Sequence, residues 1–259
     1  MLKIICVIPV RYDATRFPGK PLAMLRGKPM VRRVWEIAKK VEGVDRVLIA
    51  TDDKRIFDTA KGFGAEAVMT SPRCPSGTDR VAEAVSDVHC SFVVNLQGDE
   101  PLMPPSVIKR TIAGLVQDNS AVVSTPVVAI PSGGRTVGTA ARKRAMQNPN
   151  FVKVVFDRNG HALYFSRSVI PDTSRVGVLP TGTVYMYKHI GLYVYRKKFL
   201  ERFVRMPQSR LEKAEKLEQL RILENGFKIK VVVVDKDTVP VDTPRDLKKA
   251  ENYLKRKIQ

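Results

Sequence analysis

The chain has 259 residues, 44% of them hydrophobic, a length that allows one large α/β domain or one domain with a subdomain. No stretch approaches the ~20 apolar residues of a membrane span. The N-terminus leads directly into a strand-like segment without a signal peptide, so we expect a cytoplasmic protein with no membrane anchor. The net charge of +19 raises nucleic-acid binding as a function, but the excess of Lys and Arg is spread over many segments and no nucleic-acid-binding motif accompanies it. A basic surface and an anionic substrate are therefore favoured.

Strand-like and helix-like segments alternate through the first half of the chain. Apolar runs predict strands at 4–10, 46–50, 66–69, 91–96 and 121–128. Helical spacing, with glycine or proline at the ends, predicts helices at 29–41, 54–62, 78–88 and 105–116. This order predicts an α/β fold with a mostly parallel twisted sheet and helices on both faces.

The second half is more mixed. Asp157-Arg158-Asn159-Gly160 is a strong turn signal and predicts a hairpin between strands 152–156 and 161–164. We expect a polar connector at 132–150 and a mobile loop at 172–187. Further strands are predicted at 190–195 and 229–234, and helices at 209–223 and 243–255. With no internal repeat, we expect a single domain over 1–259 that carries 130–195 as an inserted region.

A basic loop follows the first predicted strand. It contains Arg11, Arg16 and Lys20, with Gly19 allowing close approach of the backbone to a ligand. In open α/β sheets, ligands bind at the carboxyl ends of the strands. Arginine forks and a lysine point charge suit phosphate oxygens, so a nucleoside triphosphate is the expected ligand, although neither Gly-x-x-x-x-Gly-Lys-Ser/Thr nor Gly-x-Gly-x-x-Gly is present.

Two acids are candidates for a metal site. Asp99 ends an apolar strand in Gln97-Gly98-Asp99-Glu100, where a carboxylate suits Mg²⁺ together with substrate phosphates. Asp242 follows the last strand region, and Asp242-Thr243-Pro244 taken alone is better explained by a helix cap. If both acids lie at one sheet edge, they form a metal site together.

Two other segments carry weaker signals. Ser76-Gly77-Thr78-Asp79-Arg80 could contact a base or a sugar, or it could simply begin a helix. His189 has no metal-ligand spacing to the other histidines and is more often structural, and the Glu-rich segment around Glu218 and Gln219 would ordinarily be a solvated helix face.

Taken together, the motifs resemble those of the 3-deoxy-manno-octulosonate (Kdo) cytidylyltransferase family. The matching pieces run in family order over nearly the whole chain: Ile8–Leu22, Ala50–Asp53, Ser76–Arg80, Asn95–Pro101, Asn148–Val155, Ala162–Ser168, His189–Tyr193, Leu217–Arg221 and Val241–Pro244. Their combination is specific, although no single motif would be.

The resemblance implies a Rossmann-like nucleotidyltransferase that transfers CMP from CTP to Kdo for lipopolysaccharide synthesis, with Mg²⁺ as cofactor and pyrophosphate as the second product. It also implies a homodimer, with 130–195 as a mixed hairpin region for sugar binding and dimerisation. By motif, the catalytic residues are Arg16, Lys20, Asp99 and Asp242, of which Asp99 and Asp242 hold the metal. The nucleotide-binding residues are Arg11, Thr15, Arg16, Gly19, Lys20, Ser76, Gly77 and Arg80. The sugar-binding residues are Gln97, Arg167, His189, Glu218 and Gln219.

Two residues depart from the family pattern. Val10 stands where alanine is usual and adds bulk beside the nucleotide, and Ala14 stands where serine is usual and removes a hydroxyl. The alternative substrates are another sugar acid, such as 8-amino-Kdo or sialic acid. A basic nucleic-acid-binding protein is a distant alternative function.

Overall fold

The computed structural model describes residues 3–13, 16–132, 147–173, 175 and 183–256. The chain forms two compact units. The first contains Met1–Ile112, Leu192–Val204 and Thr238–Gln259, and the second contains Ala113–Gly191 and Arg205–Asp237. The second unit thus begins before the predicted 130–195 region and takes in a later segment as well. Among the described residues, no helix is long and apolar enough to cross a membrane.

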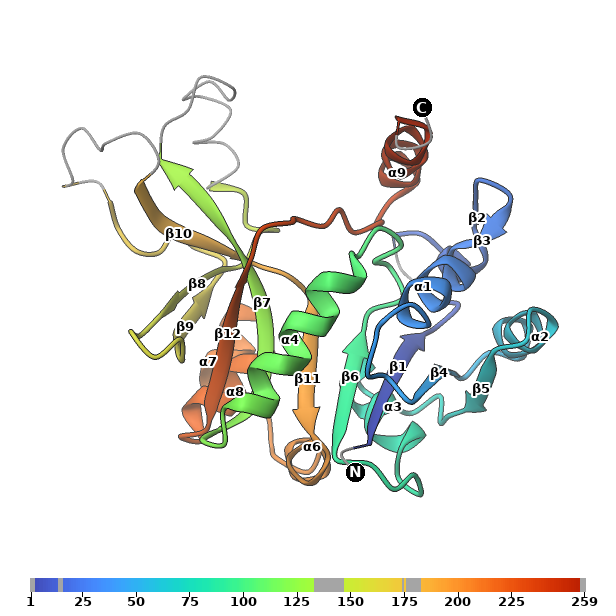
Figure 1. Ribbon diagram of the computed structural model, residues 1–259, viewed down its shortest axis with the longest axis horizontal. Coiled ribbons are helices and arrows are strands. Elements are labelled where there is room, and N and C mark those ends of the chain that lie inside the picture. The colour runs from blue at the N-terminus through green and yellow to red at the C-terminus, as the bar shows by residue number, and fades with distance from the viewer. Residues whose placement is uncertain (1–2, 14–15, 133–146, 174, 176–182, 257–259) are drawn as a thin grey trace. The chain divides into compact units, whose positions relative to one another are not determined.

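The first unit is an α/β unit in which α1, α2 and α3 flank the strands (Figure 1). Its elements are β1 (Ile4–Val10), η1 (Lys20–Leu22), β2 (Met24–Leu25), β3 (Lys28–Pro29), α1 (Met30–Ala38), β4 (Arg46–Thr51), α2 (Lys54–Gly62), β5 (Glu66–Met69), α3 (Gly77–Ala84), β6 (Phe92–Leu96), β11 (Leu192–Arg196), α6 (Lys197–Phe203) and α9 (Pro244–Arg256). Strands β5, β4, β1 and β6 are parallel neighbours, and β11 pairs antiparallel with β6. The predicted mostly parallel sheet is therefore present here.

Strand β1 is the centre of this sheet. It pairs with β4 on one side and β6 on the other, so that Val7 lies opposite both Leu48 and Asn95. All of its residues from Ile4 to Val10 are buried. Fully burying an Ile or Val side chain is worth about 1.5–3 kcal/mol, which explains why this strand is an uninterrupted apolar run.

The second unit is mostly strands. Its elements are β7 (Ala121–Ser132), β8 (Lys153–Phe156), β9 (Ala162–Ser166), β10 (Thr183–His189), α7 (Arg210–Glu215), α8 (Gln219–Glu224) and β12 (Lys228–Val234). Strand β12 runs parallel to β7, whereas β10 pairs antiparallel with both β7 and β8. Strands β8 and β9 form the predicted hairpin. Helix α4 (Pro105–Gln117) carries the chain from the first unit to the second.

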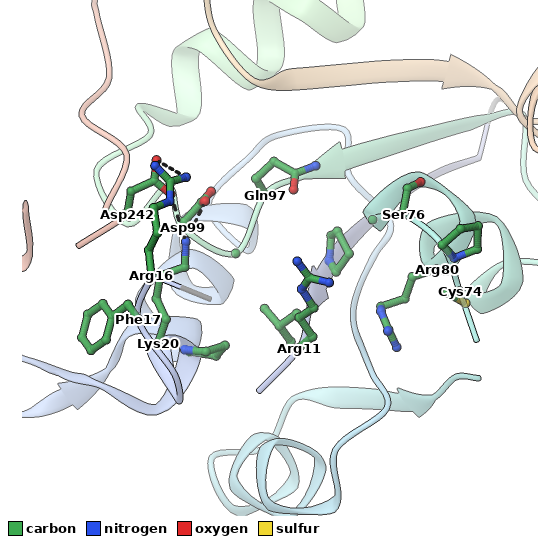
Figure 2. A pocket seen from close by; sticks show the side chains of 16 residues that line it. Arg11, Arg16, Phe17, Lys20, Cys74, Ser76, Arg80, Gln97, Asp99 and Asp242 are labelled. Atoms are coloured by element: carbon green, nitrogen blue, oxygen red, sulfur yellow. Dashed lines mark hydrogen bonds and ion pairs between the residues drawn. The ribbon is translucent and has the colours of Figure 1, made fainter. Parts of the chain in front are cut away.

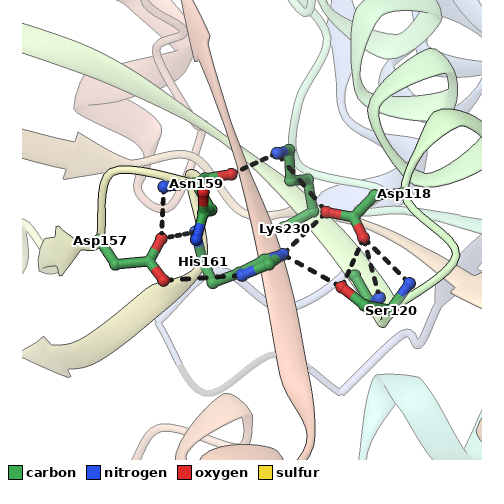
Figure 3. A network of polar contacts seen from close by, with 7 residues as sticks. Asp118, Ser120, Asp157, Asn159, His161 and Lys230 are labelled. Carbon is green, nitrogen blue, oxygen red and sulfur yellow. Dashed lines mark hydrogen bonds and ion pairs between the residues drawn. The ribbon is translucent and has the colours of Figure 1, made fainter.

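The hairpin turn is fastened to its unit by a polar network (Figure 3). The Asp157 Oδ1 accepts the backbone N–H groups of Asn159 and His161, at 2.9 and 2.8 Å. The His161 Nε2 lies 2.8 Å from Asp118 Oδ2, and the Lys230 ammonium lies 3.5 Å from the same oxygen. Burial alone would raise the pKa of Asp118, but hydrogen bonds from Ser120 and contact with His161 outweigh it and hold that pKa well below its usual range.

Two predicted elements differ in the structure. The expected mobile loop at 172–187 ends in β10, which starts at Thr183. This strand pairs with β7 along its length and with β8 at Tyr187 and Lys188, but nearby Gly and Pro residues obscure the strand pattern in the sequence. The expected helix at 209–223 is two helices, α7 and α8, because Lys216 adopts a left-handed conformation with φ of 55°. The sequence has no glycine or proline there to signal the break.

Candidate functional site: a polyphosphate pocket in the first unit

A pocket of about 420 Å³ lies where β1 and β6 end. It is lined by Pro9, Val10, Arg11, Arg16, Phe17, Lys20, Pro21, Cys74, Pro75, Ser76, Gly77, Arg80, Gln97, Gly98, Asp99 and Asp242. Figure 2 shows Arg16, Lys20, Asp99 and Asp242 together on one side, with Ser76, Cys74 and Arg80 on the other and Arg11 between them. Its volume falls within the range of small-molecule sites.

The basic loop leaves β1 and turns back on itself at Gly19. The Gly19 N–H donates to the Tyr12 carbonyl at 2.9 Å, and Gly19 has a φ of 70°. A side chain at Gly19 would be strained by this φ, and its Cβ would lie 3.2 Å from the Tyr12 ring. The closed loop brings Lys20 to the pocket at the start of η1. Thr15 and Ala14 lie outside the described residues.

Asp99 and Asp242 meet in this pocket as predicted, although they are far apart in sequence. The Val241 N–H donates to the Asp99 carbonyl at 2.8 Å, which sets the two segments side by side. The Lys20 ammonium lies 2.9 Å from Asp99 Oδ2 and 3.4 Å from Asp242 Oδ1. The Arg16 guanidinium lies 3.2 Å from Asp242 Oδ2. Two carboxylates and two cations therefore converge at one place.

The structure shows that Thr243, and not Asp242, caps helix α9. Thr243 Oγ1 accepts the Asp246 N–H at 3.3 Å, and Asp246 Oδ2 accepts the Thr243 N–H at 3.2 Å. This reciprocal pattern is a capping box at the start of α9. Because Thr243 and Asp246 cap the helix, the Asp242 carboxylate is left for the pocket.

The opposite side of the pocket is built on the start of α3. Ser76 Oγ accepts the N–H groups of Thr78 and Asp79, at 3.1 and 3.2 Å, so Ser76 is the helix cap. Arg80 is buried and donates from Nη2 to Asp52 Oδ2 at 2.7 Å and from Nη1 to Thr70 Oγ1. These bonds fix the guanidinium of Arg80 at the pocket wall and leave other N–H groups for a ligand.

Gln97 is held by a chain of amide and hydroxyl contacts. Its Nε2 donates to Asn95 Oδ1 at 2.8 Å, and Asn95 Nδ2 donates to Thr78 Oγ1 at 3.3 Å. This arrangement orients the amide of Gln97 at the pocket, and the neighbouring Glu100 is buried.

The Val10 side chain packs against Gly98, which follows β6 in the chain. A Cβ added to Gly98 would collide with Val10 Cγ1 and would lie 3.2 Å from the Pro9 carbonyl oxygen. The Val10 side chain therefore occupies the space next to Gly98, and it fits there because glycine has no side chain. Cys74 also lines the pocket, but burial and the hydrogen bond to Glu83 raise the pKa of its thiol to about 12, so it is protonated at neutral pH.

The other predicted sugar-binding residues belong to the second unit. Arg167 donates to the backbone carbonyls of Glu215, Pro149 and Lys216, at 2.8, 3.0 and 3.4 Å. His189 Nε2 lies 2.8 Å from Thr125 Oγ1, and desolvation lowers its pKa to about 3, so the ring is neutral at pH 7. Glu218 precedes α8, and Gln219 begins it and is buried. Their role in sugar binding stays a prediction.

Sequence reasoning gave Asp52 and Thr70 no role, although they hold Arg80. A signal was present, because Ala50-Thr51-Asp52-Asp53 ends a buried strand in two acids, as the Asp99 segment does. Thr70 had no such signal, since its contact with Arg80 depends on how the loop after β5 folds.

A parallel α/β unit with cations and paired carboxylates around a pocket at its carboxyl edge defines an enzyme that handles a nucleoside polyphosphate. The family model described as "Cytidylyltransferase" matches residues 5–229. Proteins named 3-deoxy-manno-octulosonate cytidylyltransferase from Thermodesulfovibrio yellowstonii and Syntrophotalea carbinolica are 47% and 46% identical, over 96% and 98% of this chain and 97% and 99% of theirs. The chain belongs to the 3-deoxy-manno-octulosonate cytidylyltransferase family.

Solved structures agree with this assignment. A structure of CMP:2-keto-3-deoxy-manno-octonic acid synthetase complexed with CTP matches with a TM-score of 0.88 and 38% identity, over 98% of this chain and 99% of that one. A cytidylyltransferase from Leptospira borgpetersenii matches with a TM-score of 0.64 and 14% identity, over 99% of this chain and 88% of that one, and this likeness concerns the fold alone. The predicted Rossmann-like nucleotidyltransferase fold and enzyme class are confirmed.

Proposed function

We propose that the protein is a nucleotidyltransferase that transfers CMP from CTP to Kdo and releases pyrophosphate. The observation that carries this proposal is the convergence of Lys20, Arg16, Asp99 and Asp242 at the end of the pocket. Family membership supports CTP and Kdo as the substrates, since the relatives carry the Kdo cytidylyltransferase name and the similar solved structure was complexed with CTP.

The proposed reaction is an in-line displacement. The anomeric hydroxyl oxygen of Kdo forms a bond to the α-phosphorus of CTP. The bond from that phosphorus to the bridging oxygen breaks, its electron pair leaves with pyrophosphate, and the hydroxyl proton passes to solvent water. Lys20 and Arg16 stabilise the negative charge that develops on pyrophosphate, and Arg11 neutralises charge along the phosphates. The protein's main contribution is positioning and electrostatic stabilisation.

The residues of the pocket fit Mg²⁺. This ion takes one or two carboxylates together with substrate phosphates, and the carboxylates of Asp99 and Asp242 already face a common cation, the Lys20 ammonium. Asp99 and Asp242 would hold the metal, which would act as a Lewis acid on the α-phosphate when bound.

The remaining predicted residues divide between nucleoside and sugar. Ser76, Gly77 and Arg80 form the wall that would face the nucleoside, with Gln97 beside it for the sugar. Arg167, His189, Glu218 and Gln219 are proposed for the sugar acid. Arg167 already gives three of its donors to backbone carbonyls, so its other N–H groups would have to reach the sugar.

Two further properties are proposed along with the activity. Because CTP is held in the cytoplasm, we place the enzyme there. The resemblance also implies a homodimer, which light scattering would test by giving about twice the chain mass of 29.0 kDa.

The activity is tested by following pyrophosphate release from CTP and Kdo. Parallel reactions with 8-amino-Kdo and sialic acid, and with ATP, GTP and UTP in place of CTP, identify the preferred pair. We expect the highest kcat/KM with CTP and Kdo. Release that is faster with another sugar acid would reassign the acceptor, and no release with any acid would overturn the proposed function.

A further inference from the structure

Two adjacent acids that follow β4, Asp52 and Asp53, are not part of the pocket lining. Asp52 takes Arg80, as described above, whereas Asp53 takes a different arginine, Arg55. The Asp53–Arg55 pair contacts the basic loop through Tyr12, and it has no part in the proposed chemistry.

Asp53 fixes the guanidinium of Arg55 in one orientation. Its Oδ1 accepts the N–H groups of Arg55 and Ile56, at 2.9 and 3.4 Å, and thereby caps α2. The same carboxylate takes the Arg55 side chain as a fork, with Nε 3.0 Å from Oδ1 and Nη2 2.6 Å from Oδ2. A bidentate pair sets the plane of the guanidinium as well as its position.

The fixed guanidinium covers the ring of Tyr12. The Arg55 Cζ lies 3.4 Å from the ring centroid, a cation–π distance. Tyr12 in turn holds Gly19, whose N–H donates to the Tyr12 carbonyl at 2.9 Å and at which an added Cβ would lie 3.2 Å from the Tyr12 ring. Lys20 follows directly and reaches Asp99 and Asp242.

We infer that Asp53, Arg55 and Tyr12 are positioning residues that set the place of Gly19 and Lys20 at the pocket before the nucleotide arrives. The inference rests on the proposed function. Without Arg55, the Tyr12 ring loses the guanidinium that packs against it, and binding of the nucleotide must itself fix Gly19 and Lys20 in place, which weakens binding. We expect the loss of affinity to concern binding of the β- and γ-phosphates, because Lys20 and Arg16 of the basic loop are the residues proposed to hold them.

The test measures the dissociation constants of CTP and CMP by calorimetric titration for the wild-type protein and its variants. Arg55→Ala should weaken CTP binding by about two- to fivefold, the range for an exposed cation–π contact, and leave CMP binding unchanged. Arg55→Lys should behave like Arg55→Ala, since lysine keeps the charge but cannot form the planar fork. Asp53→Asn should also weaken CTP binding, although asparagine still caps α2.

Matched variants separate positioning from charge and from folding. Lys54→Ala removes the same charge from the neighbouring residue, whose partner is the exposed Asp58, and should leave CTP binding unchanged. Tyr12→Phe keeps the ring and should bind CTP like the wild type, whereas Tyr12→Leu should not. Equal weakening by Lys54→Ala and Arg55→Ala would overturn the inference.

Other outcomes are equally distinct. Equal loss of CTP and CMP binding in Arg55→Ala, together with a lower Tm, would show a merely structural role and overturn the inference. An unchanged CTP constant in Arg55→Ala, with normal wild-type binding, would also overturn it. A wild-type protein that binds no CTP would instead remove the proposed function itself.

Discussion

Asp242 and Thr243 are neighbours in the chain, but one faces the pocket and the other caps a helix. Thr243 completes the cap of α9 with Asp246, while Asp242 faces Lys20 and Arg16. The same division occurs at Ser76, which caps α3, and Arg80, which lines the pocket from the next turn. In both places a capping side chain fixes the start of the helix, and a different side chain, Asp242 or Arg80, is directed to the pocket.

Replacing either pocket acid by its amide should abolish most turnover. Asp99→Asn and Asp242→Asn each remove a negative charge from the place where Lys20 and Mg²⁺ would be held, so we expect kcat to fall roughly 100-fold or more. Circular dichroism should show an unchanged fold. Asp58→Asn, the same change at an exposed acid of α2, is the control. Near wild-type kcat in either pocket variant would contradict the metal assignment.

The contact between Val10 and Gly98 predicts a stability effect. Gly98→Ala adds a Cβ that collides with Val10 Cγ1, and overpacking of this kind costs about 1–3 kcal/mol. Val10→Ala in the same chain should recover most of that loss, which urea unfolding would measure as a double-mutant cycle. Gly62→Ala, where nothing lies within 4 Å, should not destabilise the protein. Additive losses at residues 10 and 98 would show that the two do not share this space.

At the scale of elements, the break between α7 and α8 depends on one backbone conformation. Lys216 has a φ of 55°, and its N–H donates to the Glu212 carbonyl at 2.8 Å. The left-handed conformation costs an L-residue roughly 1–2 kcal/mol, a cost that glycine avoids. The break places Glu218 and Gln219 at the start of a new helix rather than in the middle of a long one.

A glycine at residue 216 should therefore stabilise the protein. We expect Lys216→Gly to raise the free energy of unfolding by about 0.5–1 kcal/mol. Lys213→Gly, inside α7, should instead lower it by about 1 kcal/mol. Both are read from the denaturant midpoint. A continuous helix over 209–223 would make both substitutions destabilising, so the sign at residue 216 decides between the two structures.

The hairpin network of the second unit predicts a pH dependence of stability. The folded-state pKa of Asp118 is held below its ordinary value of about 3.9. Its stabilising contribution is thus complete above that value and is lost as the pH falls through the folded-state pKa. Asp118→Asn should destabilise the protein by roughly 1.5–3 kcal/mol at pH 7, the range for hydrogen bonds to a charged group. The difference from wild type should shrink at pH 3, and an equal difference at both pH values would contradict this account.

At the scale of the whole molecule, the net charge of +19 bears on what the protein can bind and not on how it folds. We expect duplex DNA to bind more weakly than about 1 µM at ~0.15 M salt, as non-specific electrostatic binding does. Fluorescence anisotropy of a labelled duplex measures this. Submicromolar binding at that salt concentration would revive the nucleic-acid alternative.

Features that depend on local sequence patterns could be predicted, whereas features that depend on contacts between distant residues could not. Strands such as β1 and helices such as α2 depend on local apolar pattern and end signals, and their predicted bounds agree with the structure. The sequence predicts that Asp99 and Asp242 meet only if both lie at one sheet edge, and in the structure a backbone hydrogen bond from Val241 to Asp99 brings the two segments together. The contacts of Arg80 with Asp52 and Thr70, and the conformation of Lys216, depend on tertiary packing, which no local pattern records.

Lys20 between Asp99 and Asp242 has a consequence for how the pocket changes partners. Without a nucleotide, the ammonium is an internal counterion that keeps two neighbouring carboxylates from facing each other unscreened. If a triphosphate binds as proposed, it would draw Lys20 toward its own oxygens, and the two acids would then need a replacement cation. Nucleotide binding would be an exchange of counterions, and we expect its dependence on salt to be shallower than the number of basic residues around the pocket suggests.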